Sequence, residues 1–270
     1  MERIFLLRAY GDFVIALQAI AKSKRRIHIV ASDHLAPLYQ ALITAAVIPP
    51  LSIEFIALGI KNGQLNFFTN KQLISLDTIK QLRRLKAFIK AYPNRDGLDW
   101  IEQEIRIDLF NALLGDRFKA VVTEKAKVYQ AYDQWLSNPS TQQNSDRINT
   151  EQASNKLNSI LIFPDARLEK KAITNLTIAQ LCKLDAHNNA NFKIARFNNF
   201  NKGELSYGSF DTLIHLIQSA DYIYTSDSLP AHIAQLLSIP HTIVYTYQGV
   251  NRFCTPYALQ HQSFIETNGN

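Results

Sequence analysis

The chain has 270 residues, of which 47% are hydrophobic and 19% are charged, and its formal net charge is +6. These values indicate a globular protein, long enough for two domains or one large α/β domain, with a charge that favours an anionic partner. No apolar run reaches the length of a membrane span, and the N-terminus lacks the features of a signal peptide. The two cysteines, Cys182 and Cys254, are too few and too far apart to form a zinc site, and they suit a reducing, cytoplasmic compartment.

The first half of the chain alternates strands and helices, which is typical of a parallel sheet covered by helices on both faces. We expect strands at residues 3–7, 27–31, 51–58, 64–68 and 119–123. We expect helices at residues 12–22, 35–46, 78–92, 100–114 and 127–136.

A polar segment follows between residues 137 and 159, composed almost entirely of Ser, Asn, Gln, Thr and charged residues. Because such a segment buries little apolar surface, we expect a linker or long loop there. This divides the chain into an N-terminal domain over residues 1–140, a linker over 141–158 and a C-terminal domain over 159–270.

Alternation resumes in the second half, with strands expected at 159–163, 192–197, 222–225 and 242–245, and helices at 177–184, 211–219 and 230–237. The fold class is therefore α/β, with two doubly wound Rossmann-like domains. Open α/β sheets bind ligands beyond the carboxyl ends of their strands, so both domains could face a shared cleft.

A basic segment lies between residues 78 and 95, where six Lys or Arg residues occur without an acidic one. Apolar residues recur within it at helical spacing, so we expect an amphipathic basic helix. Its basic residues, among them Arg83, Arg84 and Lys86, are suited to phosphates or an anionic membrane surface, or form an ordinary solvated face. The charge alone permits nucleic acid, but no nucleic-acid module is visible.

The first candidate site is the segment from Arg8 to Asp12, which follows a buried strand and opens a helix. Gly11 permits the tight turn. Nearby N–H groups at the helix start keep the Asp12 carboxylate ionised, so it can accept a proton from a sugar hydroxyl. The other interpretation is that Asp12 is only a helix N-cap.

The second candidate is the lysine pair Lys170 and Lys171, which follows the first strand of the second domain. Either lysine could neutralise charge on a departing phosphate, and adjacent residues point in different directions, so only one would reach it. A solvated loop is the commoner role of such a pair.

The third candidate is the turn from Ser226 to His232, between a short strand and a helix with Pro230 near its first position. Asp227 and Ser228 are good N-caps, so the turn would direct backbone N–H groups, at the positive end of a helix dipole, toward an anion such as a pyrophosphate. His232 could contact a phosphate or a sugar, or simply pack. A capped helix without a ligand is the alternative.

Other catalytic patterns are absent from the sequence. It contains no His, Cys and Asp cluster with metal spacing, no Gly-x-Ser-x-Gly elbow and no Walker loop. The three spaced glycines of a dinucleotide site do not follow the first strand, which argues against an NAD enzyme.

Taken together, these segments resemble glycosyltransferase family nine, the heptosyltransferase family. The resemblance rests on Arg8-Ala9-Tyr10-Gly11-Asp12, on Pro164-Asp165-Ala166 with Lys170-Lys171, on Ser226-Asp227-Ser228-Leu229-Pro230-Ala231-His232, and on Pro256-Tyr257. The order and spacing of these pieces agree with the family. The matches cover the first 20 residues and much of residues 161–257.

The resemblance implies a GT-B fold and an inverting, metal-independent transfer of a heptose or similar sugar. The donor would be a nucleotide-sugar, an ADP-sugar or similar, and no cofactor would be needed. Asp12 would be the general base, and Lys171 or Lys170 would stabilise the leaving phosphate. The donor would be bound by Ser226, Asp227, Ser228, Leu229, Pro230 and His232. The acceptor would be a lipopolysaccharide-core or other surface glycan at the cytoplasmic face of the inner membrane, near Arg8 and the basic helix.

Two departures from the family pattern keep another hypothesis open. Leu229 and Asp165 stand where the family has glycine, so the chain could be a non-catalytic binding or scaffold protein in glycan assembly. A third hypothesis, suggested by the charge, is a binder of nucleic acid or anionic membranes.

Overall fold

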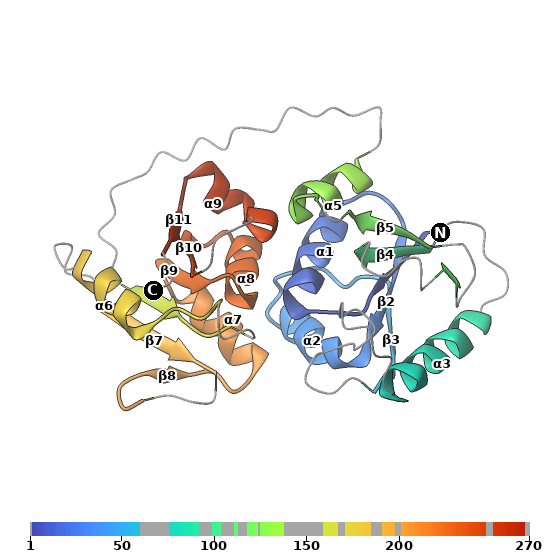
Figure 1. The fold of residues 1–270 in the computed structure, drawn as a ribbon, viewed down its shortest axis with the longest axis horizontal. Helices are drawn as coiled ribbons and strands as arrows, with labels where there is room; N and C mark the ends of the chain where they lie inside the picture. The colour runs from blue at the N-terminus through green and yellow to red at the C-terminus, as the bar shows by residue number, and fades with distance from the viewer. Residues whose placement is uncertain are drawn as a thin grey trace. The chain divides into compact units, whose positions relative to one another are not determined.

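The structure is a computed structural model that describes residues 2–59, 76–91, 99–103, 111–112, 118–123, 125–137, 159–166, 171–184, 191–197, 201–246 and 251–267. The chain forms two compact units, Met1–Leu136 and Ser137–Asn270, each built around a parallel β-sheet (Figure 1). This confirms the predicted class of two doubly wound α/β domains. The predicted linker over 141–158, the predicted strand at 64–68 and Lys170 lie outside the described residues.

The sheet of the first unit has the order β3-β2-β1-β4-β5, with all neighbours parallel. Its strands are β1 (Glu2–Leu6), β2 (Ile27–Ser32), β3 (Ile53–Ile56), β4 (Asp99–Gln103) and β5 (Phe118–Val122). Its main helices are α1 (Tyr10–Lys22), α2 (Ala36–Thr44), α3 (Leu76–Lys90) and α5 (Val128–Leu136). Strand β1 lies at the centre because its apolar run is buried on both faces of the sheet.

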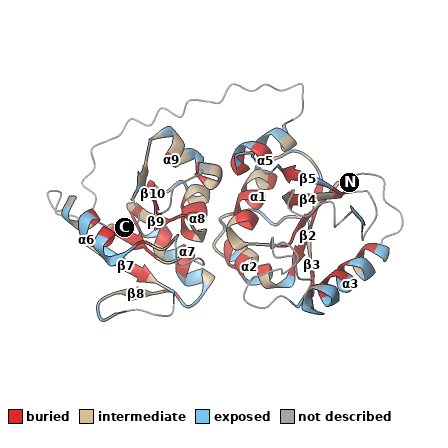
Figure 2. Cartoon of the chain, in the orientation of Figure 1, coloured by how far each residue is buried: buried red, intermediate tan, exposed pale blue. Residues whose placement is uncertain are grey.

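Helices cover both faces of this sheet. Phe5, Leu7 and Ile101 point to one face, where they pack against the buried Leu82 and Leu85 of α3. On the other face α1 packs against α5. The buried residues gather on the strands and on the helix sides turned toward them (Figure 2).

The predicted helix at residues 100–114 is wrong at its start, because residues 99–103 form β4 between β1 and β5. A buried ion pair ties this strand to β1: the Arg3 Nε and Nη2 atoms donate to the two Asp99 carboxylate oxygens at 2.9 and 2.8 Å. The apolar spacing of the segment suits a helix, but pairing with two strands overrides this local preference.

The sheet of the second unit has the order β11-β10-β9-β6-β7-β8, also parallel throughout. Its strands are β6 (Ser159–Phe163), β7 (Asn191–Arg196), β8 (Leu205–Ser206), β9 (Tyr222–Ser226), β10 (His241–Tyr245) and β11 (Phe264–Glu266). Its helices are α6 (Asn175–Leu184), α7 (Phe210–Gln218), α8 (Leu229–Leu237) and α9 (Pro256–Gln260). The sequence reading missed β8, β11 and α9, which are too short to show a periodic pattern.

Removing one partner of the Arg3–Asp99 pair should destabilise the first unit. Arg3→Ala leaves the Asp99 carboxylate, which is 2% exposed, without this charge partner, so we expect a loss of about 3–5 kcal/mol in the free energy of unfolding, measured by urea denaturation. The same change at the exposed Arg26 should cost no more than about 0.5 kcal/mol. Replacing both partners by apolar residues, Arg3→Met with Asp99→Leu, should recover most of the loss. If Arg3→Ala lowers the free energy of unfolding no more than the Arg26 control does, the ion pair does not stabilise the first unit and the prediction is wrong.

Candidate functional site

In the first unit, polar groups gather where β1 ends and α1 begins. Asp12 is the third residue of α1 and is 7% exposed, so its carboxylate lies in the first helical turn, at the positive end of the helix dipole. Ala9 occupies the N-cap position and makes no side-chain cap. The interpretation of Asp12 as only an N-cap is therefore wrong.

The loop that carries Arg8 is held from α2's side of the sheet by His34. The His34 Nε2 atom donates to the Arg8 carbonyl oxygen at 2.8 Å, and its ring meets the Tyr10 ring edge-on with centroids 5.5 Å apart. Burial lowers the pKa of His34, which favours the neutral ring that this geometry uses. These contacts fix the turn between β1 and Asp12.

The sequence reading missed Glu102, a second carboxyl beside Asp12. Glu102 lies on β4, is 1% exposed and has its pKa raised well above the ordinary value, first by burial and then by the negative charge of Asp12. The charge of Arg8 acts in the opposite direction. Because the sequence predicts a helix over residues 100–114, it does not place Glu102 at the end of the sheet.

In the second unit, an ion pair lies at the carboxyl end of the sheet. The Lys171 Nζ atom is 2.5 Å from the Asp227 Oδ2 atom, and the Asp227 side chain is only 4% exposed. The Lys171 ammonium also lies over the Phe253 ring, 5.9 Å from its centroid. Two residues predicted from separate motifs, 56 positions apart, are thus brought together.

The turn between β9 and α8 is held by hydrogen bonds of two serine hydroxyls, neither of which caps the helix. The Ser226 hydroxyl donates to the Asp165 carbonyl oxygen at 2.8 Å and lies 2.8 Å from the Ser228 hydroxyl. Ser228 occupies the N-cap position of α8 but makes no side-chain cap, so the predicted capping role of its hydroxyl is wrong. Leu229 and Pro230 are the first two residues of the helix, as the proline pattern predicted.

Two buried histidines lie behind this turn. His232 is 4% exposed, and burial lowers its pKa to about 4, although the charge of Asp227 acts to raise it. Burial also lowers the pKa of His241 to about 4. The His241 Nδ1 atom donates to the Ile239 carbonyl oxygen at 2.8 Å, while its Nε2 atom lies 2.7 Å from the Thr255 hydroxyl, a pattern that the neutral tautomer with the proton on Nδ1 satisfies.

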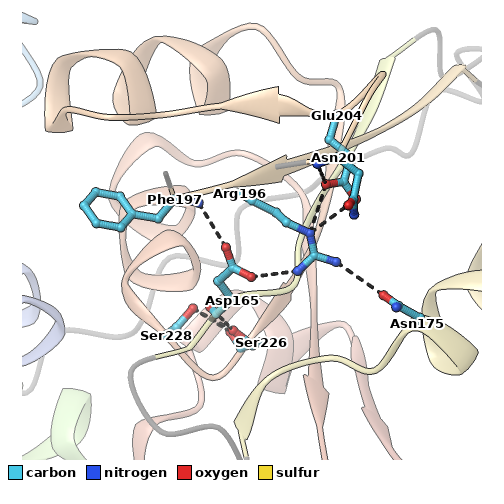
Figure 3. A network of polar contacts seen from close by, with 8 residues as sticks. All are labelled: Asp165, Asn175, Arg196, Phe197, Asn201, Glu204, Ser226 and Ser228. Atoms are coloured by element: carbon cyan, nitrogen blue, oxygen red, sulfur yellow. Dashed lines mark hydrogen bonds and ion pairs between the residues drawn. The ribbon is translucent and has the colours of Figure 1, made fainter. Parts of the chain in front are cut away.

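A network around Arg196 closes the same edge of the sheet (Figure 3). The Arg196 Nη1 atom donates to the Asp165 Oδ1 atom at 2.8 Å, and its Nε atom donates to the Glu204 carboxylate at 3.2 Å. The second Asp165 oxygen accepts the Phe197 backbone N–H at 3.0 Å. Arg196 therefore pairs with both Asp165 and Glu204 at this edge. The sequence analysis missed Arg196 as a site residue although it lies within a predicted strand.

The predicted anionic surface lies mainly on α3. Arg83, Arg84 and Lys86 are exposed on this helix, opposite its buried side, and the Arg84 guanidinium lies against Gly59 beyond β3. Arg8 lies on a different element, the loop between β1 and α1. Within the described residues, no group of three or more His, Cys, Asp or Glu side chains could hold a metal ion. In the same part of the chain, no helix is long and apolar enough to cross a membrane.

Comparison with solved structures gives the fold. The chain is similar to E. coli heptosyltransferase WaaC with ADP (TM-score 0.58, 12% identity, covering 99% of this chain and 94% of that one). It is also similar to E. coli ADP-heptose lps heptosyltransferase II, with a TM-score of 0.56 and 13% identity, covering 98% of this chain and 89% of that one. A glycosyl transferase family 9 protein from Veillonella parvula is similar with a TM-score of 0.56 and 14% identity, covering 100% of this chain and 87% of that one. This chain has the GT-B fold of the heptosyltransferases.

The resemblance to family nine is thereby confirmed at the level of the fold, over nearly the whole chain. By sequence, no family model and no curated protein matches. At identities of 11–14% the solved structures say nothing about which side chains act, so the assignments of site residues remain predictions.

The buried histidines make the second unit sensitive to acid. Below about pH 6.5 they take up protons in the unfolded chain but not in the folded one, so stability should fall as the pH drops from about 6.5 toward 4, by up to about 1.4 kcal/mol per pH unit for each histidine. Urea denaturation at several pH values measures this slope. His241→Gln should reduce it, whereas His215→Gln, on the exposed side of α7, should not. Equal slopes in the wild type and His241→Gln would contradict the prediction.

Proposed function

We propose that the chain is an inverting, metal-independent glycosyltransferase that transfers a heptose or similar sugar from a nucleotide-sugar donor, ADP-linked, to a lipopolysaccharide-core or other cell-surface glycan. The observation that carries this proposal is the Lys171–Asp227 ion pair at the start of α8, in a fold shared with WaaC, which was solved with ADP. A cation at this edge suits a diphosphate, because parallel sheets bind ligands beyond the carboxyl ends of their strands.

On the donor side, Lys171 would stabilise the charge of the leaving nucleoside diphosphate. The ion pair holds its ammonium at the site before the donor binds, and Asp227 would then accept hydrogen bonds from donor-sugar hydroxyls. Ser226, Ser228 and the first turn of α8, which contains Leu229, Pro230 and His232, would surround the pyrophosphate.

On the acceptor side, Asp12 would be the general base. The acceptor oxygen attacks the anomeric carbon as the bond from that carbon to the diphosphate oxygen breaks on the opposite side, so the configuration inverts. The hydroxyl proton passes to the Asp12 carboxylate, and the negative charge leaves with the nucleoside diphosphate. Arg8, beside Asp12, would attract an anionic acceptor. This reaction needs both units to face a shared cleft, which is part of the proposal.

Leu229 supports a second candidate function, a donor-binding scaffold without catalysis. Its side chain stands where the family has a glycine that lets phosphate approach the backbone closely. Asp165, the other departure from the family pattern, pairs with Arg196, which also pairs with Glu204, so this network keeps a net negative charge. Donor binding without any transfer would favour the scaffold.

Two substitutions separate the roles of the two units. Asp12→Asn should lower kcat by about 10²–10⁴-fold with little change in donor affinity, because only the base is lost. Lys171→Met should weaken both donor binding and turnover, because the cation facing the diphosphate is lost. Calorimetry with nucleoside diphosphates and their sugars measures the binding, and product mass measures the transfer.

Matched controls are Asp211→Asn and Lys202→Met, which change exposed residues of the same types. Both should behave as the wild type. A folded protein that binds no nucleoside diphosphate and transfers no sugar would refute the glycosyltransferase proposal.

We also propose that α3 holds the protein at the anionic cytoplasmic face of the inner membrane, where a lipid-linked acceptor lies. Leu76 is 76% exposed and Ile79 is 37% exposed, and both share the solvent side of α3 with the exposed Lys80, Arg83 and Lys86. Apolar side chains set among basic ones are typical of helices that lie on anionic lipid surfaces.

This proposal predicts binding to vesicles that contain phosphatidylglycerol but not to purely phosphatidylcholine vesicles. The double substitution Arg83→Gln with Lys86→Gln should weaken binding by about 30-fold, from about 1 kcal/mol for each basic residue. The pair Lys193→Gln with Lys202→Gln, exposed in the second unit, is the control. Cosedimentation at several salt concentrations measures the effect. Equal binding to both kinds of vesicle would contradict it.

A further inference from the structure

The side chain of Glu102 is the least compensated carboxyl in the described part of the chain. It is 1% exposed, and neither oxygen accepts a hydrogen bond of standard geometry from any described residue. The backbone N–H groups of Leu7 and Arg8 face it closely enough to lower its pKa somewhat, but burial dominates in the opposite direction. A buried carboxylate with so few donors is unfavourable, so burial favours the neutral acid.

The strand geometry explains how Glu102 reaches the candidate site. Side chains alternate along β4, so Ile101 points into the core under α3, while Trp100 and Glu102 point to the face covered by α1 and α5. Trp100 accordingly contacts Trp135 of α5, with ring centroids 5.4 Å apart. Because β4 runs parallel to β1 with Ile101 beside Phe5, Glu102 lies near the carboxyl end of β1, where α1 begins with Asp12.

The ionisable groups around Glu102 come from three segments of the chain. Asp12 of α1 contributes a negative charge, and Arg8, at the end of β1, contributes a positive one. From α5, the Tyr132 hydroxyl is buried without a hydrogen-bond partner among the described residues, and its pKa is raised by burial and then by the charges of Glu102 and Asp12. Among the described residues, one cation, Arg8, acts on these two carboxyls, so a single proton shared by the carboxyls would make this group neutral.

We propose that Glu102 is a proton-bearing positioning residue for Asp12, which leaves the single negative charge of the carboxyl pair on Asp12. This inference rests on the proposed function, in which Asp12 takes the acceptor proton. During transfer that proton forms a bond to Asp12 and later passes to solvent, while Glu102 keeps its own proton throughout. Ionisation of Glu102 at high pH would place a second negative charge beside Asp12, repel it and slow transfer.

The protonation state can be measured without any enzyme assay. Infrared difference spectra of the full chain, wild type minus Glu102→Gln, should show the carbonyl stretch of a protonated acid at pH 7 that disappears at high pH. In an Asp12→Asn background, the midpoint of this titration should move to lower pH, because the neighbouring negative charge is gone. Substitution of the exposed Glu266 by Gln should leave the protonated-acid signal unchanged. The inference is overturned by a carboxylate signal for Glu102 at pH 7, or by a titration midpoint that does not change in the Asp12→Asn background.

The catalytic consequence is read from the pH profile of sugar transfer. Glu102→Gln keeps a neutral side chain of the same shape, so it should stay within about threefold of the wild-type kcat at neutral pH and lose the alkaline decline. An alkaline decline that persists in Glu102→Gln shows that Glu102 does not cause it and overturns the positioning role.

The two measurements separate the failure of this inference from that of the proposed function. A protonated Glu102 that responds to Asp12→Asn, in a chain that transfers no sugar, upholds the carboxyl pair and refutes the proposed function. Sugar transfer by a chain whose Glu102 is ionised at pH 7 supports the proposed function and refutes the inference about the carboxyl pair.

Discussion

Parallel strands that are buried on both faces are the constraint on which both units depend. The central strand of the first unit carries Ile4, Phe5 and Leu6 with no exposed surface, and β6 carries a similar run from Ile160 to Phe163. Such strands leave almost no place for polar side chains along their length. Polar groups therefore collect where the strands end, and these carboxyl ends hold Arg8, Asp165, Arg196 and Asp227.

Burial of this kind makes charge compensation decisive. Two of the buried charges have opposite partners: Arg3 pairs with Asp99, and Asp227 pairs with Lys171. The half-buried Arg196 pairs with two carboxylates. The pairs Arg3–Asp99, Lys171–Asp227 and Arg196–Asp165 also join residues that are far apart in the sequence. Among the described residues Glu102 forms no ion pair, and in our proposal a proton removes its charge instead.

The two candidate sites are organised differently. In the second unit, the Lys171–Asp227 pair and the serine contacts form a polar edge that is already connected, with neutral histidines packed behind it. In the first unit, Asp12 lies in the first turn of α1, and its charge acts on the buried carboxyl of Glu102. The first arrangement suits a phosphate, and the second suits the removal of a proton.

The sequence by itself determined the alternation of strands and helices, and with it the fold class. It also placed Asp12 and the segment from Ser226 to His232 at strand-to-helix turns, because an apolar run followed by turn residues and a helix start is a local signal. Only the tertiary structure decided that residues 99–103 form a strand, since pairing with β1 and β5 outweighs a helical spacing.

The same holds for the contacts that complete the sites. The Ser228 hydroxyl bonds within its turn instead of capping α8, Arg196 pairs with Asp165 at the ends of two strands, and Glu102 comes to lie beside Asp12. Each depends on residues far apart in the chain meeting at one sheet edge. Local sequence does not predict such contacts, because strand order and register determine them.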